Sequence, residues 1–264
     1  MNEDAYAGRW IARLRGRIVA QGGTPEQARR AALSRFKETP EILFVPMPNL
    51  PHLPPIVQEA LNTLSPDQTI YLVGGAVRDL LVGRSSRDFD FALPQGGIAT
   101  ARQVAKALQA HFYPLDLERD TGRVVLSTSQ GEHLYLDFAT FRGKTLEDDL
   151  RGRDFTVNAI ALDPRTGQIF DPLGGARDVK DKLLRACSPT SFSEDPLRIL
   201  RSVRLAADFN FRILPETRQA MKESVALLST VSAERVRDEL FRILEGPAPA
   251  TCLRALDLLG VLRV

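Results

Sequence analysis

The chain has 264 residues, enough for one large or two small domains with a hydrophobic core. Hydrophobic residues make up 44% and charged residues 26%, which is typical of soluble globular proteins, and no apolar run reaches the length of a membrane span. A net charge of +2 excludes a chain that is polycationic throughout. Cys187 and Cys252 form neither a disulfide framework nor a metal-binding spacing, so we expect a cytoplasmic protein.

The first part of the chain, residues 1–68, is predicted to hold basic helices followed by a proline-rich linker. Trp10, Leu14 and Ile18 recur at every fourth position. This spacing places all three side chains on one face of a helix. The sequence therefore predicts an amphipathic helix over residues 8–20.

A second helix is predicted directly afterwards. Thr24-Pro25-Glu26-Gln27 combines an N-cap residue, a proline at the first helical position and a capping-box glutamine, which predicts a helix to about Lys37. Six prolines between residues 40 and 55 then predict a linker or extended segment without regular structure. Residues 1–37 carry an excess of five positive charges, which indicates either an arm that meets a phosphate backbone or a solvated helix surface.

The two following parts differ in their periodicity. Residues 69–187 alternate between strand and helix patterns, whereas residues 188–264 show helical patterns, and we predict an α+β fold without internal repeats. In the first part we expect strands at 70–73 and 89–92, helices at 76–82 and 98–110, and a β-hairpin of 123–128 with 133–139. In the second part we expect helices at 197–207, 218–228 and 234–244.

A glycine pair stands between the first of these strands and the helix that follows it. Gly74 and Gly75 allow the backbone to approach a phosphate closely, and the unpaired amide groups at a helix start attract an anion. Arg78, in the first turn or so, can add a cationic contact. Read alone, the two glycines are equally consistent with a tight turn.

Two aspartates lie on the next predicted strand. Asp88 and Asp90 are two residues apart, so their side chains share one face, while Phe89 and Phe91 take the opposite face toward the core. Converging carboxylates repel each other unless a cation lies between them, and hard oxygen ligands suit Mg²⁺ that carries substrate phosphates. The combination with the glycine pair favours a site for phosphate and magnesium over ordinary solvated acids.

Five motifs, in the order of the family, resemble those of the class II tRNA nucleotidyltransferases and their bacterial poly(A) polymerase relatives. They are GGAVRD with RDFD (motif A), LEDDLRGRDFTVNAIALD at 146–163 (motif B), FDPLGGARDVKDKLLRA at 170–186 (motif C), SEDPLRILRSVRLAADFNF at 193–211 (motif D) and SAERVRDEL at 232–240 (motif E). The resemblance implies a polymerase-β-like head domain with a small mixed sheet over residues 69–187. It also implies an all-helical neck domain over residues 188–264 that selects the nucleotide.

The resemblance assigns roles to individual residues. It implies that Asp88 and Asp90 are catalytic and bind the metal, and that further residues bind nucleotide: Gly74, Gly75, Arg78, Arg153, Asp195, Arg198, Arg201 and Arg204. Asp195 and Arg198, expected as neighbours on one helix, are implied to select the base. A carboxylate accepts the exocyclic amino group of cytosine or adenine, and a guanidinium donates to the ring nitrogen. Guanine and uracil present the reverse order and would leave polar groups unpaired.

The implied reaction is the addition of C and/or A to the 3′ acceptor end of tRNA from CTP and ATP, with Mg²⁺ as cofactor and pyrophosphate as product. A poly(A) polymerase acting on other RNAs has all five motifs and stays an alternative. A third reading is an RNA-binding module without activity, against which the retained aspartates and the Asp195/Arg198 pair argue. The sequence indicates no oligomeric state.

Two features depart from the family pattern. Only Gly143-Lys144-Thr145 stand between the Thr140-Phe141-Arg142 strand end and motif B, and a short loop at this place is a feature of members that add only CC, which keeps CC addition as an alternative. The chain also ends at Val264, soon after motif E. We therefore expect either a head-and-neck fragment or an RNA grip from elsewhere, for example from residues 1–37. Asp137 is either a third active-site carboxylate or a plain strand acid.

Overall fold

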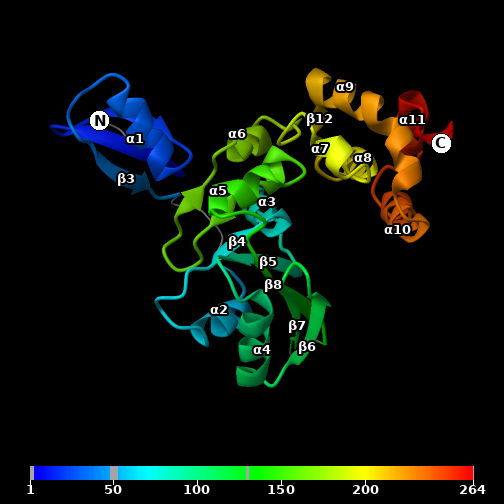
Figure 1. The fold of residues 1–264 in the computed structure, drawn as a ribbon, viewed down its shortest axis with the longest axis horizontal. Helices are drawn as coiled ribbons and strands as arrows, with labels where there is room; N and C mark the ends of the chain where they lie inside the picture. Colours follow the sequence, from blue (N-terminus) through cyan, green and yellow to red (C-terminus); the bar gives the residue numbers. More distant parts are fainter. Residues whose placement is uncertain (1–2, 48–52, 129–130, 264) are drawn as a thin grey trace. The chain divides into compact units, whose positions relative to one another are not determined.

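A computed structural model describes residues 3–47, 53–128 and 131–263 of the chain (Figure 1). Internal contacts divide the chain into two compact units, which we describe separately. The sheet unit comprises Met1–Arg151 and Asn158–Gly175, and the helical unit comprises Gly152–Val157 and Ala176–Val264. Within the described residues, no helix is both long and apolar enough to cross a membrane.

The sheet unit is built around a mixed sheet of seven strands in the order β10-β9-β4-β5-β8-β7-β6. Only β5 and β8 run parallel, and the other neighbours are antiparallel. The strands are β4 (Tyr71–Val73), β5 (Asp88–Leu93), β6 (His111–Asp116), β7 (Thr121–Ser127), β8 (His133–Thr140), β9 (Ala161–Leu162) and β10 (Ile169–Phe170). The α-helices that accompany this sheet are α2 (Pro55–Asn62), α3 (Gly75–Leu81), α4 (Gly97–Ala107) and α5 (Leu146–Arg151), and α1 belongs to the N-terminal part described below.

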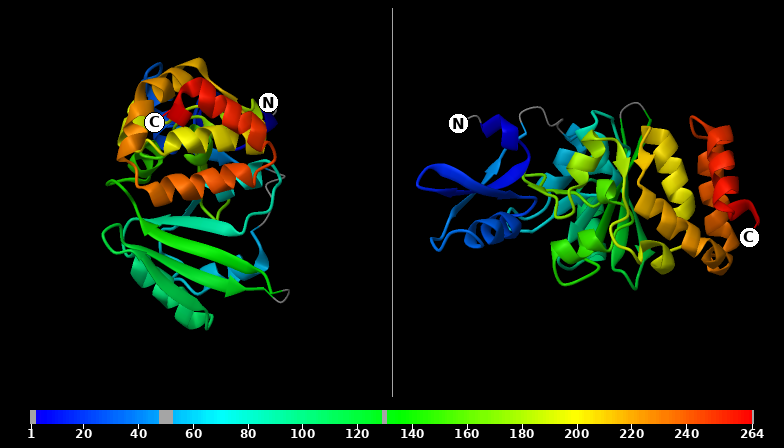
Figure 2. Two further views of the ribbon diagram at one scale, coloured as in Figure 1. Left: turned by 90° about the vertical axis from the view of Figure 1, so that its right-hand side faces the viewer. Right: turned by 90° about the horizontal axis from the view of Figure 1, so that it is seen from above.

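The core of this sheet forms where alternating apolar side chains meet the helices. Phe89 and Phe91 of β5 are buried, and Phe91 stacks on Phe138 of β8 with ring centroids 5.1 Å apart. Helix α4 lies along β7 and β8 on one face of the sheet (Figure 2). Its buried residues Ala101 and Val104 are small, which lets the helix pack closely on the strands.

The predicted elements of residues 69–187 are confirmed with small shifts in their ends. The predicted hairpin forms from β7 and β8, although residues 129–130 of its turn lie outside the described residues. Gly83 follows the end of α3 with φ of 70°, as expected for a helix-terminating glycine. Strand β6, which was not predicted, pairs with β7; its Pro114 breaks the regular strand pattern in the sequence.

The helix predicted for residues 8–20 is wrong. The segment forms the antiparallel strands β1 (Arg9–Leu14) and β2 (Arg17–Gly22). Arg15 and Gly16 both have positive φ, at 48° and 77°, which is the conformation of a tight two-residue hairpin turn. The apparent helical spacing therefore joined residues of two different strands across that turn.

The linker prediction is also wrong over residues 41–45, which form strand β3 (Glu41–Val45) beside β1. Pro40 and Pro46 flank this apolar run without interrupting it, so its amide groups are free to pair. The rest of the predicted linker includes residues 48–52, which lie outside the described residues, and Pro55, which begins α2. The capped helix is confirmed as α1 (Pro25–Leu33), four residues shorter than predicted.

The helical unit contains six α-helices: α6, which begins at the end of the sheet unit (Gly175–Lys180), α7 (Ser191–Glu194), α8 (Arg198–Phe209), α9 (Pro215–Ser224), α10 (Ala233–Leu244) and α11 (Pro249–Leu259). Helix α8 packs against both α10 and α11 (Figure 2). Strands β11 (Leu183–Leu184) and β12 (Arg212–Ile213) form a short parallel pair. The helices predicted at 197–207 and 234–244 are confirmed as α8 and α10. The helix predicted at 218–228 forms as α9, which ends at Ser224 and continues as a 3-10 helix over Val225–Thr230, and α11 was not predicted. The predicted domain boundaries at residues 68 and 187 stay a prediction.

Candidate active site

The two aspartates of motif A lie as predicted. Asp88 and Asp90 are exposed on β5, while Phe89 and Phe91 between and after them are buried. The alternation follows from the strand geometry, in which successive side chains point to opposite faces of the sheet. One face of β5 therefore presents two carboxylates to solvent over a core of aromatic rings.

The sheet register brings the glycine pair next to these aspartates. Val73, the last residue of β4, is the antiparallel partner of Asp90, and the chain then turns at Gly74 and Gly75 into α3. Gly74 has φ of 74° and ψ of −144°, a combination that is open only to glycine. The turn and the start of α3 therefore lie next to the two aspartates.

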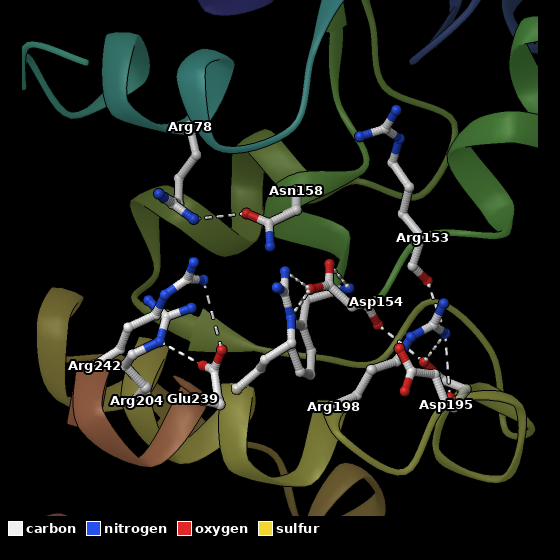
Figure 3. Close-up of polar contacts among 12 residues, drawn as sticks. Arg78, Arg153, Asp154, Asn158, Asp195, Arg198, Arg204, Glu239 and Arg242 are labelled. Atoms are coloured by element: carbon white, nitrogen blue, oxygen red, sulfur yellow. Dashed lines mark hydrogen bonds and ion pairs between the residues drawn. The ribbon is translucent and has the colours of Figure 1, made fainter. Parts of the chain in front are cut away.

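Arg78 lies in a different environment from the predicted phosphate contact. It is buried, and its Nη1 donates to Oδ1 of Asn158 over 2.7 Å, as Figure 3 shows. Its Nε and Nη2 donate to Asp79 at 3.0 and 2.8 Å. The side chain therefore joins α3 to Asn158 of motif B within the sheet unit. Its predicted contact with nucleotide stays a prediction.

The acidic face fits a magnesium ion that arrives with its substrate. Two exposed carboxylates supply hard oxygen ligands, and Mg²⁺ is commonly bound by one or two carboxylates together with water and substrate phosphates. Among the described residues there is no group of three or more potential ligand side chains that could enclose a metal. Two carboxylates leave further coordination positions of such an ion to water and to phosphate oxygens.

A third carboxylate of this face is held by an arginine. Asp137 of β8 is the parallel partner of Asp90, and Arg123 of β7 donates to both of its oxygens over 2.7 Å. The guanidinium also lies 5.1 Å from the ring centroid of Tyr135. The hydrogen bonds to Asp137 raise the pKa of Arg123, and the charges of Asp88 and Asp90 act in the same direction. Asp137 is thus an ion-paired acid in this structure.

In the helical unit, the expected placement of Asp195 and Arg198 on one helix is wrong. Asp195 is the residue that ends α7, in an extended conformation, and α8 begins at Arg198. Two features favour a turn at this point. A proline follows Asp195, and the amide of Leu197 donates to Oδ1 of Asp195 over 3.3 Å. The backbone amide of Arg198 still donates to the carbonyl of Asp195, so the turn keeps the two residues near each other.

Each of these two side chains has partners inside the helical unit (Figure 3). Arg235 donates to both oxygens of Asp195. Arg198 is buried, and it donates to the hydroxyl of Ser191 at 2.7 Å and to the carbonyl of Gly152 at 3.0 Å. Arg198 Nε has no hydrogen-bond partner anywhere in the described ranges 3–47, 53–128 and 131–263, which leaves one guanidinium donor for a ligand.

The arginines further along α8 are also ion-paired. Arg201 donates to Asp154 from two nitrogens, at 3.0 and 2.6 Å. Burial acts to lower the pKa of Arg201, but the adjacent Asp154 carboxylate raises it above the usual value, so the group stays charged. Arg204 donates to Glu239 of α10 over 2.6 Å (Figure 3). Both arginines therefore have carboxylate partners within the helical unit.

Motif B contributes backbone as well as side chains. Arg153 is half-buried, and its carbonyl oxygen lies 3.5 Å from Nη1 of Arg198. The carbonyl oxygen of Gly152 accepts from Nη2 of the same arginine. The Asp154 carbonyl accepts from the amide of Cys187 over 3.1 Å. Residues 152–154 therefore form a support for the start of α8. The nucleotide contacts predicted for Arg153, Arg201 and Arg204 stay predictions.

Two arginines were missed by sequence reasoning. The predicted hairpin centred on residue 130 already implies that Arg123 faces Asp137, because their positions are equally far from the turn. Arg235 stands in motif E, forty residues after Asp195, and no local pattern connects them. The first partner was therefore accessible from the sequence, whereas the second required the packing of α10.

The segment between β8 and α5 is short and closely packed. Residues 141–145 connect the two elements, and a side chain added at Gly143 would come 2.4 Å from Cβ of Asp148. Thr145 and Asp148 exchange backbone-to-side-chain hydrogen bonds of 3.0 and 3.2 Å, which is a capping box at the start of α5. The hydrogen bond with the Thr145 side chain is the largest cause that lowers the pKa of Asp148, and the bond from the Thr145 backbone acts in the same direction.

Comparison with known proteins gives matches to both units. Residues 70–185 match the family model of the poly(A) polymerase head domain, and residues 210–264 match that of the probable RNA and SrmB-binding site of polymerase A. A CC-adding tRNA nucleotidyltransferase of Geobacter sulfurreducens is 43% identical over 191 residues, covering 72% of this chain and 44% of the relative. An A-adding tRNA nucleotidyltransferase of Deinococcus radiodurans is 42% identical, covering 72% of this chain and 43% of the relative.

The fold is similar to that of a solved relative. A CCA-adding enzyme of Thermotoga maritima in complex with tRNA has a TM-score of 0.67 and 30% identity, covering 79% of this chain and 54% of that chain. The chain spans less than half the length of the two curated relatives above. The matched regions hold the acidic face of β5 and the C-terminal helices.

Proposed function

Because the chain belongs to the tRNA nucleotidyltransferase family that shares the poly(A) polymerase head domain, we propose that it adds C and/or A to the 3′ end of tRNA. In this reaction the 3′-hydroxyl oxygen of the RNA forms a bond to the α-phosphorus of CTP or ATP. The bond from that phosphorus to the bridging oxygen breaks, and pyrophosphate leaves. The cytoplasmic location expected from the sequence belongs to the same proposal.

The observation that carries the proposal is the register between β4 and β5. Val73 pairs with Asp90, so the Gly74-Gly75 turn begins beside the two exposed aspartates. Asp88 and Asp90 hold Mg²⁺, which when bound neutralises phosphate charge and lowers the pKa of the attacking hydroxyl. The glycine turn presents backbone amides, without side chains in the way, to the phosphates of the nucleotide. Arg123, on the same face, keeps the charge of Asp137 balanced.

Base selection belongs to Asp195 and Arg198. The carboxylate of Asp195 has about four acceptor positions, and its contacts with Arg235 and Leu197 use three of them. One position on Oδ2 is left for the amino group of cytosine or adenine. Arg198 keeps Nε for the ring nitrogen. Uracil and guanine, which present acceptor and donor in the opposite order, leave both groups without partners at a cost of a few kcal/mol.

The test uses three tRNA transcripts, ending before the tail, after C and after CC. Each is incubated with CTP, ATP, UTP or GTP, and the 3′ ends of the products are sequenced. We expect incorporation from CTP and/or ATP and none from UTP or GTP. Long A tails on unrelated RNA would instead support a poly(A) polymerase. A protein that binds these RNAs but incorporates nothing would be the inactive RNA-binding module.

Variants of the acidic face separate catalysis from binding. Asp88→Asn and Asp90→Asn should abolish incorporation, while Asp67→Asn, which changes an exposed aspartate outside the site, serves as the matched control. All three should unfold at similar temperatures, since each side chain is exposed. Undiminished incorporation by Asp88→Asn would contradict the role of this face.

Addition of CC alone is the second candidate, and a specific observation favours it. The connection between β8 and α5 is short, and Gly143 and the capping box of Thr145 with Asp148 hold it in place. A connection held in this way leaves little length for a loop that rearranges between the C and A steps. The transcript ending in CC decides: A addition to it rejects CC-only activity.

A further inference from the structure

The N-terminal module, which we define as residues 3–47, lies outside both regions that match family models. It folds as the sheet β2-β1-β3 covered by α1. Trp10 and Ala12 of β1 pack against Ala28 and Ala32 of α1 to form its own small core. All five motifs lie after residue 69, so none of them is in this module.

The module is fixed to the rest of the sheet unit at β10 and the loop that follows it. The indole Nε1 of Trp10 donates to the carbonyl of Ile169 over 2.8 Å, and Gln27 Nε2 donates to that of Pro172 over 2.9 Å. Gly23 accepts from the amide of Asp171, and a side chain at Gly23 would lie 1.7 Å from the Asp171 carbonyl. Anything that binds the module is thereby held on the sheet unit.

Six of the eight positive charges of the module fall into two groups. Arg13 and Arg15 are neutralised by ion pairs with Glu41 and Glu38. A second group is exposed and, within the described part of the chain, makes no side-chain hydrogen bond or ion pair. We call this group, which runs from α1 into the segment after it, the basic strip: Arg29, Arg30, Arg35 and Lys37.

Apolar side chains are exposed within the same stretch. Leu33 is 47% exposed and Phe36 is 41% exposed. Since α1 buries Ala28 and Ala32, its outer surface carries Leu33 together with the first two arginines of the strip. The helix dipole stabilises cations near the C-terminal end of α1, but it gives no reason to expose an aromatic ring among them.

We propose that the basic strip and Phe36 form a second RNA contact, in which the cations bind backbone phosphates and the ring stacks on an unpaired base. Clustered cations with an interleaved exposed aromatic ring are the features by which single-stranded nucleic acid is bound without sequence preference. The inference rests on the proposed function for the identity of the RNA, a tRNA. It assigns the N-terminal module to substrate grip, separate from base choice.

Binding of a labelled tRNA transcript to the full chain, measured by fluorescence anisotropy over a range of salt concentrations, tests the proposal. The variant R29Q/R30Q/R35Q/K37Q should bind about tenfold more weakly or worse near 0.1 M salt, and its salt slope should fall by roughly one unit for each phosphate that the variant no longer neutralises. R102Q/K106Q, which removes two exposed cations of α4 outside the module, is the control for loss of charge and should keep the wild-type slope.

Phe36 is tested separately because stacking is not electrostatic. F36A should weaken binding without changing the salt slope, and F36W should restore it. With tRNA saturating, each module variant should incorporate nucleotide at the wild-type rate, with KM for tRNA raised. An unchanged affinity and slope in the four-residue variant would overturn the inference while leaving the proposed function intact. Absence of nucleotide incorporation by the wild-type chain, with tRNA binding still dependent on the strip, would overturn only the proposed function.

Discussion

Arg235 of α10 donates from a single guanidinium nitrogen to both carboxylate oxygens of Asp195, over 3.2 and 2.9 Å. The contact fixes the rotation of the carboxylate and leaves one acceptor position open on Oδ2. Under the proposed function, α10 thus sets the orientation in which Asp195 meets a base. Motif E, which supplies Arg235, acts in this way on motif D although forty residues separate the two side chains.

Removal of this arginine should relax base choice with little effect on stability. In Arg235→Gln the Asp195 carboxylate loses the ion pair that fixes its orientation and keeps, among the described residues, only the bond from Leu197 N. We expect the preference for CTP over UTP, measured as the ratio of kcat/KM, to fall about tenfold, since one misaligned hydrogen bond costs about 1–1.5 kcal/mol. The pair is half-exposed, so the free energy of unfolding should change by less than about 1 kcal/mol.

Arg237 offers a matched control for that experiment. It lies on the same helix and is ion-paired to exposed Asp238. Arg237→Gln removes the same charge from α10 without contacting Asp195, so its nucleotide preference should equal that of the wild type. Equal losses of preference in the two variants would show that the effect comes from charge alone.

The ion pair between Arg123 and Asp137 predicts a change in metal binding. In Arg123→Gln, Asp137 loses its partner beside Asp90 and becomes available as a third carboxylate ligand. We expect the variant to bind Mn²⁺ more tightly than the wild type in the absence of RNA and nucleotide, by about tenfold, as measured by electron paramagnetic resonance.

The double variant R123Q/D137N is the control, because it removes both charges of the pair. Its Mn²⁺ affinity should return to that of the wild type, since only Asp88 and Asp90 are left as ligands. If R123Q and R123Q/D137N bound Mn²⁺ equally, Asp137 would have no part in metal binding even when released.

Sequence patterns predicted the secondary structure correctly where all residues of a pattern belong to the same strand. The D-F-D-F alternation follows the two-residue period of β5, and the alternation at 123–128 and 133–139 follows that of β7 and β8. Both predictions are confirmed. The helix predicted at residues 8–20 failed because Trp10 and Ile18 lie on opposite sides of the Arg15-Gly16 turn. Any period measured across a two-residue turn mixes two elements.

The candidate site was predicted as a set of residues but not as a set of contacts. Arg201 and Arg204 were identified through the resemblance of motif D, yet their carboxylate partners Asp154 and Glu239 come from distant segments. Such pairs depend on how helices pack, which local sequence does not encode. Asp195 shows the same limit in another form, because the turn that ends α7 decided its position.

Gly74 and Gly167 both have positive φ, but we expect nucleotide binding to be affected by an alanine substitution only at Gly74. At φ 74° and ψ −144°, an added Cβ is strained, and we expect Gly74→Ala to destabilise the fold by about 1–3 kcal/mol and to weaken nucleotide binding. Gly167, at φ 71° in open space, is the control, and Gly167→Ala should keep wild-type nucleotide affinity. Denaturant unfolding and nucleotide titration measure the two effects. A Gly74→Ala variant with unchanged affinity would remove the glycine turn from the phosphate site.

The thiol of Cys187 should make stability fall at alkaline pH. Burial, followed by the nearby Asp154 charge, raises the pKa of Cys187 from 9.0 to about 12. The native state therefore keeps the proton where the unfolded state has released it. The resulting stabilisation is complete below pH 9 and declines progressively between pH 9 and about 12, at about 1.4 kcal/mol for each pH unit.

Comparison with Cys187→Ala isolates this contribution, since tyrosines and lysines titrate in the same range in both proteins. Between pH 7.5 and pH 10 the free energy of unfolding should fall by about 1 kcal/mol more in the wild type than in the variant. Burial also raises the pKa of Cys252, so in the native protein neither thiol should react with a thiol-specific disulfide reagent at pH 8. Rapid labelling of Cys187 under native conditions, or parallel stability curves for the two proteins, would contradict the raised pKa, because both require a thiolate that the folded state does not form.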